Sequence, residues 1–369
     1  MRIGIDYRPV TAAPWSGIAR QTLALEAALQ ARAGCEVLRF TACPADHPHR
    51  RLACCPARPS PVNGLHRPRE RLGFEGVFLP QAIRDQRLDG YIATANVGLP
   101  LWRAPRGVAY VQLLHDLFQL TLRNRHADRW RELAYRLIDH GGIRRSLATA
   151  DAIWVPSRHT AAEAARLFPQ WAAKVAVLPN AVPGQAADPQ ALPDGLPSRF
   201  WLLVGSREPR KNLPWFLEQW RAESERGPLP ALVVVGAVSD APPHLRRLPG
   251  LNWLSGIGDA ELSAVYAAAE RLWQPSYAEG FGLPVVEALA QGTPVAVASG
   301  SALDEVAPPD APRFAPDDAA GLRALMRRLA AEPGGADGGA GRRWAERYGL
   351  EAYAGRLNLL LDVLLRGRT

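Results

Sequence analysis

The feature that most constrains the fold is a repeated alternation of short apolar runs with longer segments of helical pattern. In the first half, Ile3–Ile5 and Val108–Leu114 are separated by helix-length segments such as Arg20–Ala31, and in the second half Trp201–Val204 and Leu232–Val235 continue the same rhythm. Runs that are apolar at nearly every position are typical of strands buried on both faces, as in parallel sheets covered by helices. The sequence therefore predicts an α/β protein with two doubly wound parallel sheets.

The chain divides at a proline-rich segment near its middle. Residues 183–197 contain four prolines and two glycines, a composition that ends strands and helices. With 369 residues, the chain has the length for two domains of about 100–200 residues each. We therefore expect a first domain over residues 1–182, a linker over 183–197 and a second domain over 198–345. Residues 346–369 are expected to form a helix that packs back on the first domain.

Export, membrane crossing and a cysteine framework are not indicated. The opening residues Met1–Asp6 alternate like a strand and contain no apolar run of the roughly 7–15 residues that a signal peptide needs. No apolar run reaches the roughly 20 residues that span a bilayer. The four cysteines lie in one region without the spacing of a zinc site, and Cys54 and Cys55 are adjacent. We therefore expect a cytoplasmic protein.

Positive charge is concentrated in the first half of the chain. Residues 1–185 contain 25 Lys/Arg and 14 Asp/Glu, whereas residues 186–369 contain 19 and 22. A basic surface can contact anionic lipid headgroups or hold phosphate-bearing ligands. The arginine- and proline-rich residues 44–71 are interpreted either as a solvated loop or as a contact for an anionic acceptor or membrane surface. Nucleic acid is not predicted as a partner, because the basic residues lack interleaved aromatic residues.

One stretch of the second half combines glycines, a proline and two glutamates after a short strand-like run. Gly280 and Gly282 let the backbone approach a ligand, and Pro284 suits the first turn of a helix. The start of such a helix presents free N–H groups and the positive end of its dipole to a phosphate. Glu279 precedes the helix and Glu287 lies inside it, where carboxylates can accept hydrogen bonds from the hydroxyls of a sugar and a ribose. In the alternative interpretation, Glu279 caps the helix and Glu287 is a surface residue.

The stretch from Glu279 to Glu287, with Gly-Phe-Gly-Leu-Pro between the glutamates, resembles the signature of glycosyltransferase family 4. Seven further segments resemble the mannosyltransferase-like branch of this family, in the same order along the chain: Arg2–Arg8, Ser16–Arg20, His115–Leu117, Val155–Ser157, Val177–Asn180, Gly205–Asn212 and Gly292–Val295. The resemblance covers nearly the whole chain. It implies the GT-B fold, in which two Rossmann-like domains face each other across a cleft, the first binding the acceptor and the second the nucleotide sugar.

The resemblance also implies roles for residues of the second domain. Glu279 is expected to contact hydroxyls of the donor sugar and to be catalytic, and Glu287 is expected to contact the ribose of the nucleotide. Four consecutive residues between them are expected to approach the sugar or the diphosphate, chiefly through backbone amides: Gly280, Phe281, Gly282 and Leu283.

Positive charge on the leaving diphosphate is expected from the turn after the Trp201–Val204 run. Family members commonly have an arginine straight after the glycine of this turn and a lysine five residues later. Here Ser206 occupies the arginine position, Lys211 occupies the lysine position, and Arg207 and Arg210 are both candidates for the second cation.

Two residues of the first domain complete the implied site. Gly17, in the turn after the first strand, would let the main chain approach the diphosphate. His115, at the end of the Val108–Leu114 strand, would face the reacting carbon and either bond the 6-hydroxyl of the sugar or relay the proton of the acceptor. A histidine that only caps the strand end beside Asp116 is the alternative.

The implied activity is a retaining transfer of a hexose, with mannose from GDP-mannose preferred, to a polysaccharide or a polyprenyl-linked oligosaccharide. No Asp-x-Asp motif follows an apolar strand, so neither a metal clamp nor another cofactor is expected. Expected partners are the nucleotide-sugar donor, the glycan or polyprenyl-linked acceptor and the anionic cytoplasmic face of the inner membrane. A UDP- or dTDP-sugar donor and a nucleotide-sugar epimerase on the same fold remain alternatives. A Rossmann dehydrogenase is disfavoured because no G-x-G-x-x-G follows the first strand.

Overall fold

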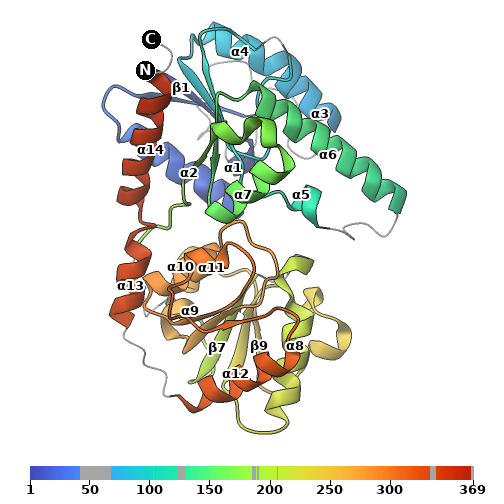
Figure 1. Cartoon of the computed structure of the whole chain (residues 1–369). Coiled ribbons are helices and arrows are strands. Elements are labelled where there is room, and N and C mark those ends of the chain that lie inside the picture. Colours follow the sequence, from blue (N-terminus) through green and yellow to red (C-terminus); the bar gives the residue numbers. More distant parts are fainter. Residues whose placement is uncertain are drawn as a thin grey trace. The chain divides into compact units, whose positions relative to one another are not determined.

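The computed structural model describes residues 1–41, 68–102, 104–122, 129–184, 188, 191–205, 207–332 and 338–366 (Figure 1). The chain forms two compact units. Unit 1 comprises Met1–Ala181 and Leu350–Thr369, and unit 2 comprises Val182–Gly349. By this division, residues 182–197 are counted with unit 2, and the chain passes between the units twice, once before Val182 and once before Leu350.

Unit 1 is built on a parallel sheet of six strands in the order β2-β1-β3-β4-β5-β6. Its strands are β1 (Arg2–Asp6), β2 (Glu36–Phe40), β3 (Gly90–Ala93), β4 (Ala109–Leu113), β5 (Ala152–Val155) and β6 (Val175–Val177). β3 and β4 are buried at every residue, as their apolar sequences require. The strand order reverses between β1 and β3, which is the position at which doubly wound sheets bind ligands.

The helices of unit 1 cover this sheet. They are α1 (Arg8–Ala12), α2 (Gly17–Gln30), α3 (Pro68–Gly73), a π-helical turn η2 (Phe74–Phe78), α4 (Leu79–Asp85), α5 (Phe118–Thr121), α6 (Arg129–Thr149), α7 (Arg158–Leu167), the 3-10 turn η3 (Pro169–Lys174) and α14 (Leu350–Arg366). α2 starts where the hydroxyl of Ser16 accepts a hydrogen bond from the amide of Ala19, an N-cap that satisfies one free donor of the first turn.

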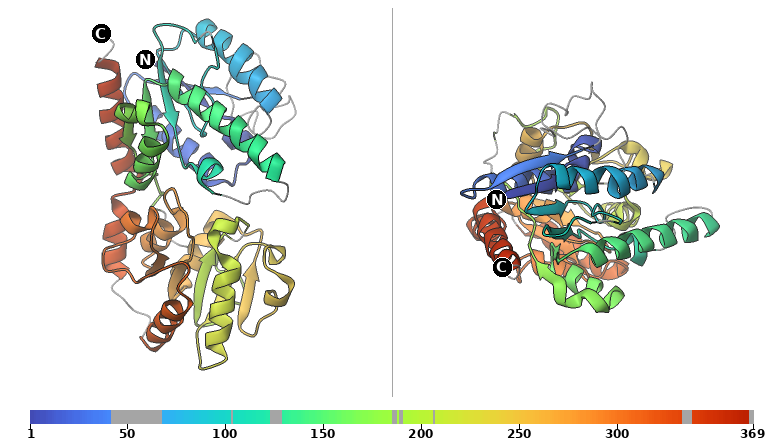
Figure 2. Two further views of the ribbon diagram at one scale, coloured as in Figure 1. Left: turned by 45° about the vertical axis from the view of Figure 1, so that its right-hand side comes forward. Right: turned by 90° about the horizontal axis from the view of Figure 1, so that it is seen from above.

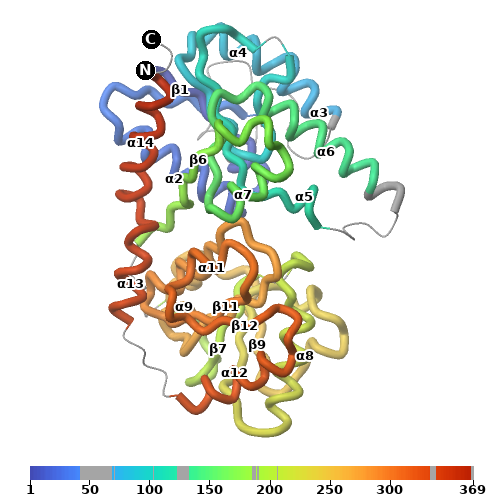
Figure 3. The backbone as a smooth tube through the Cα atoms, viewed as in Figure 1, coloured from blue at the N-terminus to red at the C-terminus, as the bar shows by residue number. Residues whose placement is uncertain are grey.

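The last helix, α14, belongs to unit 1 although its sequence follows unit 2 (Figure 3). Tyr353, Leu357 and Leu361 are spaced four residues apart, so they share one helix face, and they are buried in the cluster that α2 also enters. At the end of α2, Arg32 donates hydrogen bonds to Asn358 at 2.9 Å and Asp362 at 2.6 Å. α14 therefore closes one side of the unit-1 core.

Unit 2 is built on a second parallel sheet, in the order β12-β11-β10-β7-β8-β9. Its strands are β7 (Phe200–Val204), β8 (Ala231–Val235), β9 (Leu251–Leu254), β10 (Arg271–Gln274), β11 (Val295–Ala298) and β12 (Arg313–Phe314). Trp201 on β7 and Trp273 on β10, two adjacent central strands, have ring centroids 5.0 Å apart. Both rings lie in the core on one face of the sheet. The strand order reverses between β7 and β10.

The helices of unit 2 are α8 (Leu213–Ser224), α9 (Asp259–Ala268), α10 (Leu283–Ala290), α11 (Leu303–Val306), α12 (Ala319–Ala331) and α13 (Gly338–Glu346), with 3-10 turns η5 (Pro209–Lys211), η6 (Val238–Asp240) and η7 (Pro243–Leu245). Both units are thus doubly wound α/β structures, as the sequence predicts. Across the described parts of both units, no helix has the combined length and apolar character needed to cross a bilayer.

Candidate active site

The carboxyl ends of β7 and β10 lie side by side in the sheet of unit 2. The two strands pair in parallel, with Trp201 opposite Arg271 and Leu202 opposite Leu272. The loop that follows β7 carries Arg210 and Lys211, and the loop that follows β10 carries Glu279. Because the strand order reverses between these two strands, both loops lie at the position where an open α/β sheet binds its ligand.

The turn after β7 directs its two cations back to the sheet. Gly205 adopts a positive φ of 84° at the end of β7, and the 3-10 turn Pro209–Lys211 follows. Asn212 stands in the left-handed region at φ 58°, where its side-chain amide donates to the carbonyl of Pro316 at 3.0 Å. A Cβ at position 205 would lie 3.6 Å from Cε of Lys211, which shows how closely the lysine passes over the strand end.

Arg210, Lys211 and Glu279 form an ionic cluster at this strand end. Lys211 Nζ lies 2.6 Å from Glu279 Oε1, and Arg210 Nη1 lies 2.6 Å from Glu279 Oε2. Gln274, the last residue of β10, donates a further hydrogen bond to Glu279 Oε1 at 3.0 Å. The side chain of Glu279 is only 6% exposed, so both of its oxygens are satisfied by protein donors. Arg210, and not Arg207, is thus the arginine that shares the carboxylate of Glu279 with Lys211.

The ionic cluster keeps Glu279 charged. Burial favours the protonated carboxyl, but the charges of Lys211 and Arg210 outweigh burial and lower the pKa of Glu279 to about 2. The carboxylate is therefore ionised at all pH values near neutrality and cannot donate a proton. Its chemical capacity is to accept hydrogen bonds from hydroxyls and to hold the two cations in place.

The start of α10 presents free backbone donors beside this cluster. Gly282 caps the helix at φ 101°, and a Cβ there would lie 2.5 Å from Cδ2 of Leu303, so only glycine fits. The Phe281 ring packs edge-on against Tyr348, at a centroid distance of 5.3 Å. Within the described residues, the amides of Phe281, Gly282 and Leu283 have no hydrogen-bond acceptor. Such donors at a helix start suit an anion.

Two other predicted residues of unit 2, Glu287 and Arg207, lie outside the ionic cluster. Glu287 is buried on α10 and accepts a hydrogen bond from the Tyr266 hydroxyl of α9 at 2.8 Å. Arg207 is exposed and forms no ion pair with any described residue. Ser206 lies outside the described residues. The interpretation of Glu287 as a surface residue is thus wrong, because the carboxylate is buried and hydrogen-bonded.

His115 in unit 1 follows β4 and is held from two sides. Its amide donates to Asn96 Oδ1 at 2.8 Å, and its ring Nε2 lies 2.8 Å from the carbonyl oxygen of Thr94. A carbonyl only accepts, so Nε2 carries the hydrogen and Nδ1 is left with a lone pair. Burial lowers the pKa of the imidazole, although the Thr94 carbonyl and Asp116 act in the opposite direction. His115 is therefore a neutral base with Nδ1 as the accepting atom.

Gly17 is the first residue of α2 and is exposed, directly after the Ser16 cap. Gly17 and His115 belong to unit 1, whereas Arg210, Lys211 and Glu279 belong to unit 2.

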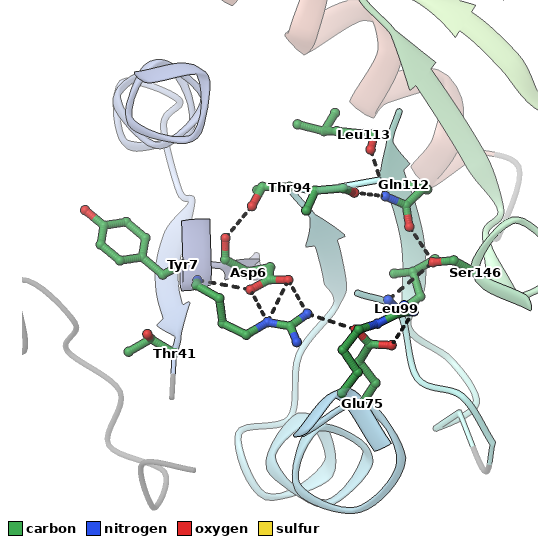
Figure 4. A network of polar contacts seen from close by, with 12 residues as sticks. Asp6, Tyr7, Thr41, Glu75, Thr94, Leu99, Gln112, Leu113 and Ser146 are labelled. Atoms are coloured by element: carbon green, nitrogen blue, oxygen red, sulfur yellow. Dashed lines mark hydrogen bonds and ion pairs between the residues drawn. The ribbon is translucent and has the colours of Figure 1, made fainter. Parts of the chain in front are cut away.

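A buried ion network in unit 1 was not predicted from the sequence (Figure 4). Arg8 donates to Asp6, with Nη2 2.6 Å from Oδ2, and to Glu75 at 3.2 Å, and all three side chains are almost fully buried. The Thr94 hydroxyl donates to the carbonyl of Asp6, and the Thr94 carbonyl is the acceptor that fixes His115. The network thus joins the end of β1 to the imidazole. In the sequence, the sign of this network is the pair of opposite charges, Asp6 and Arg8, that follows the apolar run Ile3–Ile5.

Family models match most of the chain. A model described as Glycosyltransferase Family 4 matches residues 15–184, and a model described as Glycosyl transferases group 1 matches residues 199–332. The chain belongs to glycosyltransferase family 4. The family indicated by the eight sequence segments is thereby confirmed.

Curated relatives of this family 4 protein match over shorter stretches. MMP alpha-(1->4)-mannosyltransferase of Mycolicibacterium hassiacum is 45% identical over 82 residues, which are 21% of this chain and 20% of that protein. O-antigen chain mannosyltransferase B of Escherichia coli is 33% identical over 115 residues, which are 29% of this chain and 30% of that protein. The matched part of the chain therefore spans at most 30% of the length of these two relatives.

Solved structures resemble the family 4 protein over its whole length. Sucrose-phosphate synthase from Thermosynechococcus elongatus superposes with a TM-score of 0.69 at 21% identity and covers 100% of both chains. Anabaena HepE in complex with UDP superposes with a TM-score of 0.64 at 14% identity, covering 98% of this chain and 99% of that chain. These similarities establish the fold, which is the GT-B fold of glycosyltransferases.

Proposed function

We propose that this family 4 protein transfers a hexosyl group from a nucleotide-sugar donor to a glycan or polyprenyl-linked acceptor. The observation that carries the proposal is the ionic cluster of Arg210, Lys211 and Glu279 at the strand-order reversal of unit 2. It combines two cations, one charged acceptor of hydroxyl hydrogen bonds and, at the start of α10, free backbone donors. A diphosphate joined to a sugar needs these three kinds of group.

The cations and the amides receive the charge that develops on the leaving diphosphate. As the bond between sugar and phosphate breaks, negative charge grows on the phosphate oxygens, and preorganised donors stabilise that charge. In this proposal Arg210 and Lys211 supply the positive charge, so the reaction needs no metal.

The acceptor hydroxyl must lose a proton while the sugar is transferred with retention of configuration. We assign the positioning of the reacting groups to His115, whose neutral Nδ1 can accept a hydrogen bond from the 6-hydroxyl of the donor or from the acceptor. Asn96 and the Thr94 carbonyl fix the ring orientation, and the Asp6–Arg8–Glu75 network fixes Thr94. Glu287 is assigned to the ribose and Gly17 to the diphosphate.

For the donor, we expect GDP-mannose to bind more tightly than UDP- or dTDP-sugars, because curated relatives of the matching region are mannosyltransferases. The measurement is a thermal-shift panel with GDP, UDP and dTDP, followed by incubation of each nucleotide sugar without acceptor. The largest shift with GDP and only slow hydrolysis of GDP-mannose support the assignment. A larger thermal shift with UDP or dTDP would contradict GDP-mannose as the donor. Conversion of a nucleotide sugar into its epimer would indicate an epimerase instead of a transferase.

A polyprenyl-linked acceptor lies at a membrane surface, and α6 has features that fit such a surface. Four apolar side chains of its first half, Leu133, Tyr135, Leu137 and Ile138, are exposed. Figure 2 shows this half of α6 extending beyond the rest of unit 1. Since residues 1–185 carry the excess of arginines, unit 1 combines apolar side chains with positive charge, as peripheral membrane proteins do.

For the membrane contact, we expect the protein to bind phosphatidylglycerol vesicles and to bind more weakly as salt concentration rises. Replacing Leu137 with glutamate should weaken vesicle binding by about tenfold, since an exposed leucine would no longer enter the interface. Leu359→Glu, at another exposed leucine, on α14, is the matched control and should bind like the wild type. Co-sedimentation across a salt series is the assay. Equal binding by both variants would contradict a role for α6.

A further inference from the structure

A pocket of unit 2 lies at the amino ends of the sheet strands, whereas the ionic cluster lies beyond their carboxyl ends. The pocket is lined by the first residues of β10 and β11, the turn before β11, the loop before β12 and the facing sides of α12 and α13, and its volume is about 490 Å³. Arg271, which opens β10, and Arg328 on α12 line this pocket. β10 therefore has the pocket at its amino end and Glu279 beyond its carboxyl end.

Arg271 is a buried cation without a bonded partner in the described structure. Its residue is only 9% exposed, and its guanidinium makes neither an ion pair nor a side-chain hydrogen bond with any described residue. The neighbouring acids are engaged elsewhere, because Glu270 binds Arg199 at 2.6 Å and Glu332 binds Arg328 at 3.3 Å. Glu270 and Glu332 therefore act on the charge of Arg271 only through electrostatic attraction beyond ion-pair distance.

The guanidinium nitrogens of Arg271 keep access to the open space of the pocket, since none of them is among the fully buried atoms without a partner. Burial lowers the pKa of Arg271, Arg328 lowers it further, and Glu332 and Glu270 act in the opposite direction. Arginine nevertheless stays protonated in proteins, so the charge and its donors remain in the pocket wall. Because no described acceptor bonds these donors, a ligand with acceptor atoms in the pocket can bond Arg271.

The walls of this half-open pocket are well packed. α13 packs closely on the turn after α10, since a Cβ at Gly338 would lie 3.0 Å from the carbonyl oxygen of Gly292. The indole of Trp344 is fixed by a hydrogen bond to the Val306 carbonyl at 2.7 Å and lines the pocket. Pro308, Pro309 and Pro312 add further apolar wall. The pocket thus combines two arginines and two acids, Asp310 and Glu332, with rigid apolar surfaces. Because Glu332 pairs with Arg328 at 3.3 Å, Arg271 is the cation of the pocket without an ion pair among the described residues.

We propose that this pocket binds a small organic anion, whose phosphate or carboxylate group is held by Arg271 and Arg328 and whose apolar part packs against Trp344 and the prolines. The site is separate from the ionic cluster and does not depend on the proposed transferase activity. Its ligand would contact the amino end of β10, the strand whose last residue, Gln274, bonds Glu279.

Calorimetric titration with phenyl phosphate tests the proposal in the Lys211→Ala background, where binding of phosphate by the ionic cluster is weakened. We expect saturable binding that Arg271→Met weakens by at least about tenfold, since a charge-assisted bidentate contact is lost. Arg323→Met, on the same helix as Arg328 but bonded to Gln219 at 2.7 Å, should leave the affinity unchanged. Inorganic phosphate should bind more weakly than phenyl phosphate, because it has no apolar part.

The Tm of Arg271 variants distinguishes an arginine that holds a ligand from one that only supports the fold. In phosphate-free buffer, Arg271→Met should have a Tm equal to or above that of the wild type, because an apolar side chain replaces a buried, unbonded charge. Arg271→Gln provides a second variant if methionine perturbs folding. Unchanged affinity in both Arg271 variants, equal affinity for phenyl and inorganic phosphate, or no binding up to about 10 mM would overturn the proposal. A lower Tm of Arg271→Met with unchanged binding would assign Arg271 to structure alone.

Discussion

Replacing Lys211 with alanine is expected to lower the rate of sugar transfer by about 10²–10³-fold, because one preorganised donor to the developing negative charge is removed. The protein should stay folded, since Arg210 still pairs with Glu279 at 2.6 Å. The measurement is kcat and KM with a saturating acceptor. The loss should appear mainly in kcat, because the charge on the leaving group is largest in the transition state.

Arg207→Ala is the matched control for Lys211. Arg207 lies in the same turn but is exposed and outside the ionic cluster, so its removal should change kcat by less than about threefold. Wild-type rates in Lys211→Ala, or equal losses in both variants, would contradict the assignment of the cation.

Replacing Glu279 with alanine is expected to destabilise unit 2 by about 3–5 kcal/mol and to abolish measurable transfer. The side chains of Arg210 and Lys211 are 12% and 13% exposed, so the variant leaves two largely buried cations without their shared carboxylate. Urea denaturation monitored by tryptophan fluorescence gives the free energy of unfolding. Adding a nucleoside diphosphate should recover more stability in Glu279→Ala than in the wild type, because the freed cations can bind it.

Glu208→Ala controls for simple loss of a partner of Arg210. The Glu208 side chain is 58% exposed and lies 2.8 Å from Arg210, so this variant should lose less than about 1 kcal/mol. The pH dependence gives a second check. The pKa of Glu279 falls from 4.5 to about 2 on folding, so its contribution is complete above the unfolded value and is lost as pH falls through about 2. Equal acid sensitivity of wild type and Glu279→Ala would contradict the ionic cluster.

Most strands were predictable from the sequence, because their burial leaves a continuous apolar run. The predicted run Ile3–Ile5 lies within β1, and the runs Trp201–Val204 and Leu232–Val235 lack only the first residues of β7 and β8. Short elements were not predictable. α1 spans Arg8–Ala12 and β12 spans Arg313–Phe314, lengths too small for a period to emerge, so tertiary contacts decide their conformation.

The residue types of the candidate site were also predictable, but their pairing was not. Whether Arg207 or Arg210 accompanies Lys211 depends on the backbone path from Gly205 through the left-handed Asn212, which places only the later arginine against Glu279. The Asp6–Arg8–Glu75 network joins residues that are 67 positions apart. Such pairings depend on how the helices pack on the sheet, which sequence spacing does not specify.

The position of α14 has a consequence for the order in which the protein is made. The face with Tyr353, Leu357 and Leu361 that completes the core of unit 1 is synthesised only after the whole of unit 2. Until then the apolar side chains of α2 that this face covers remain open to water. The core of unit 1 can therefore be completed only after unit 2 has been synthesised.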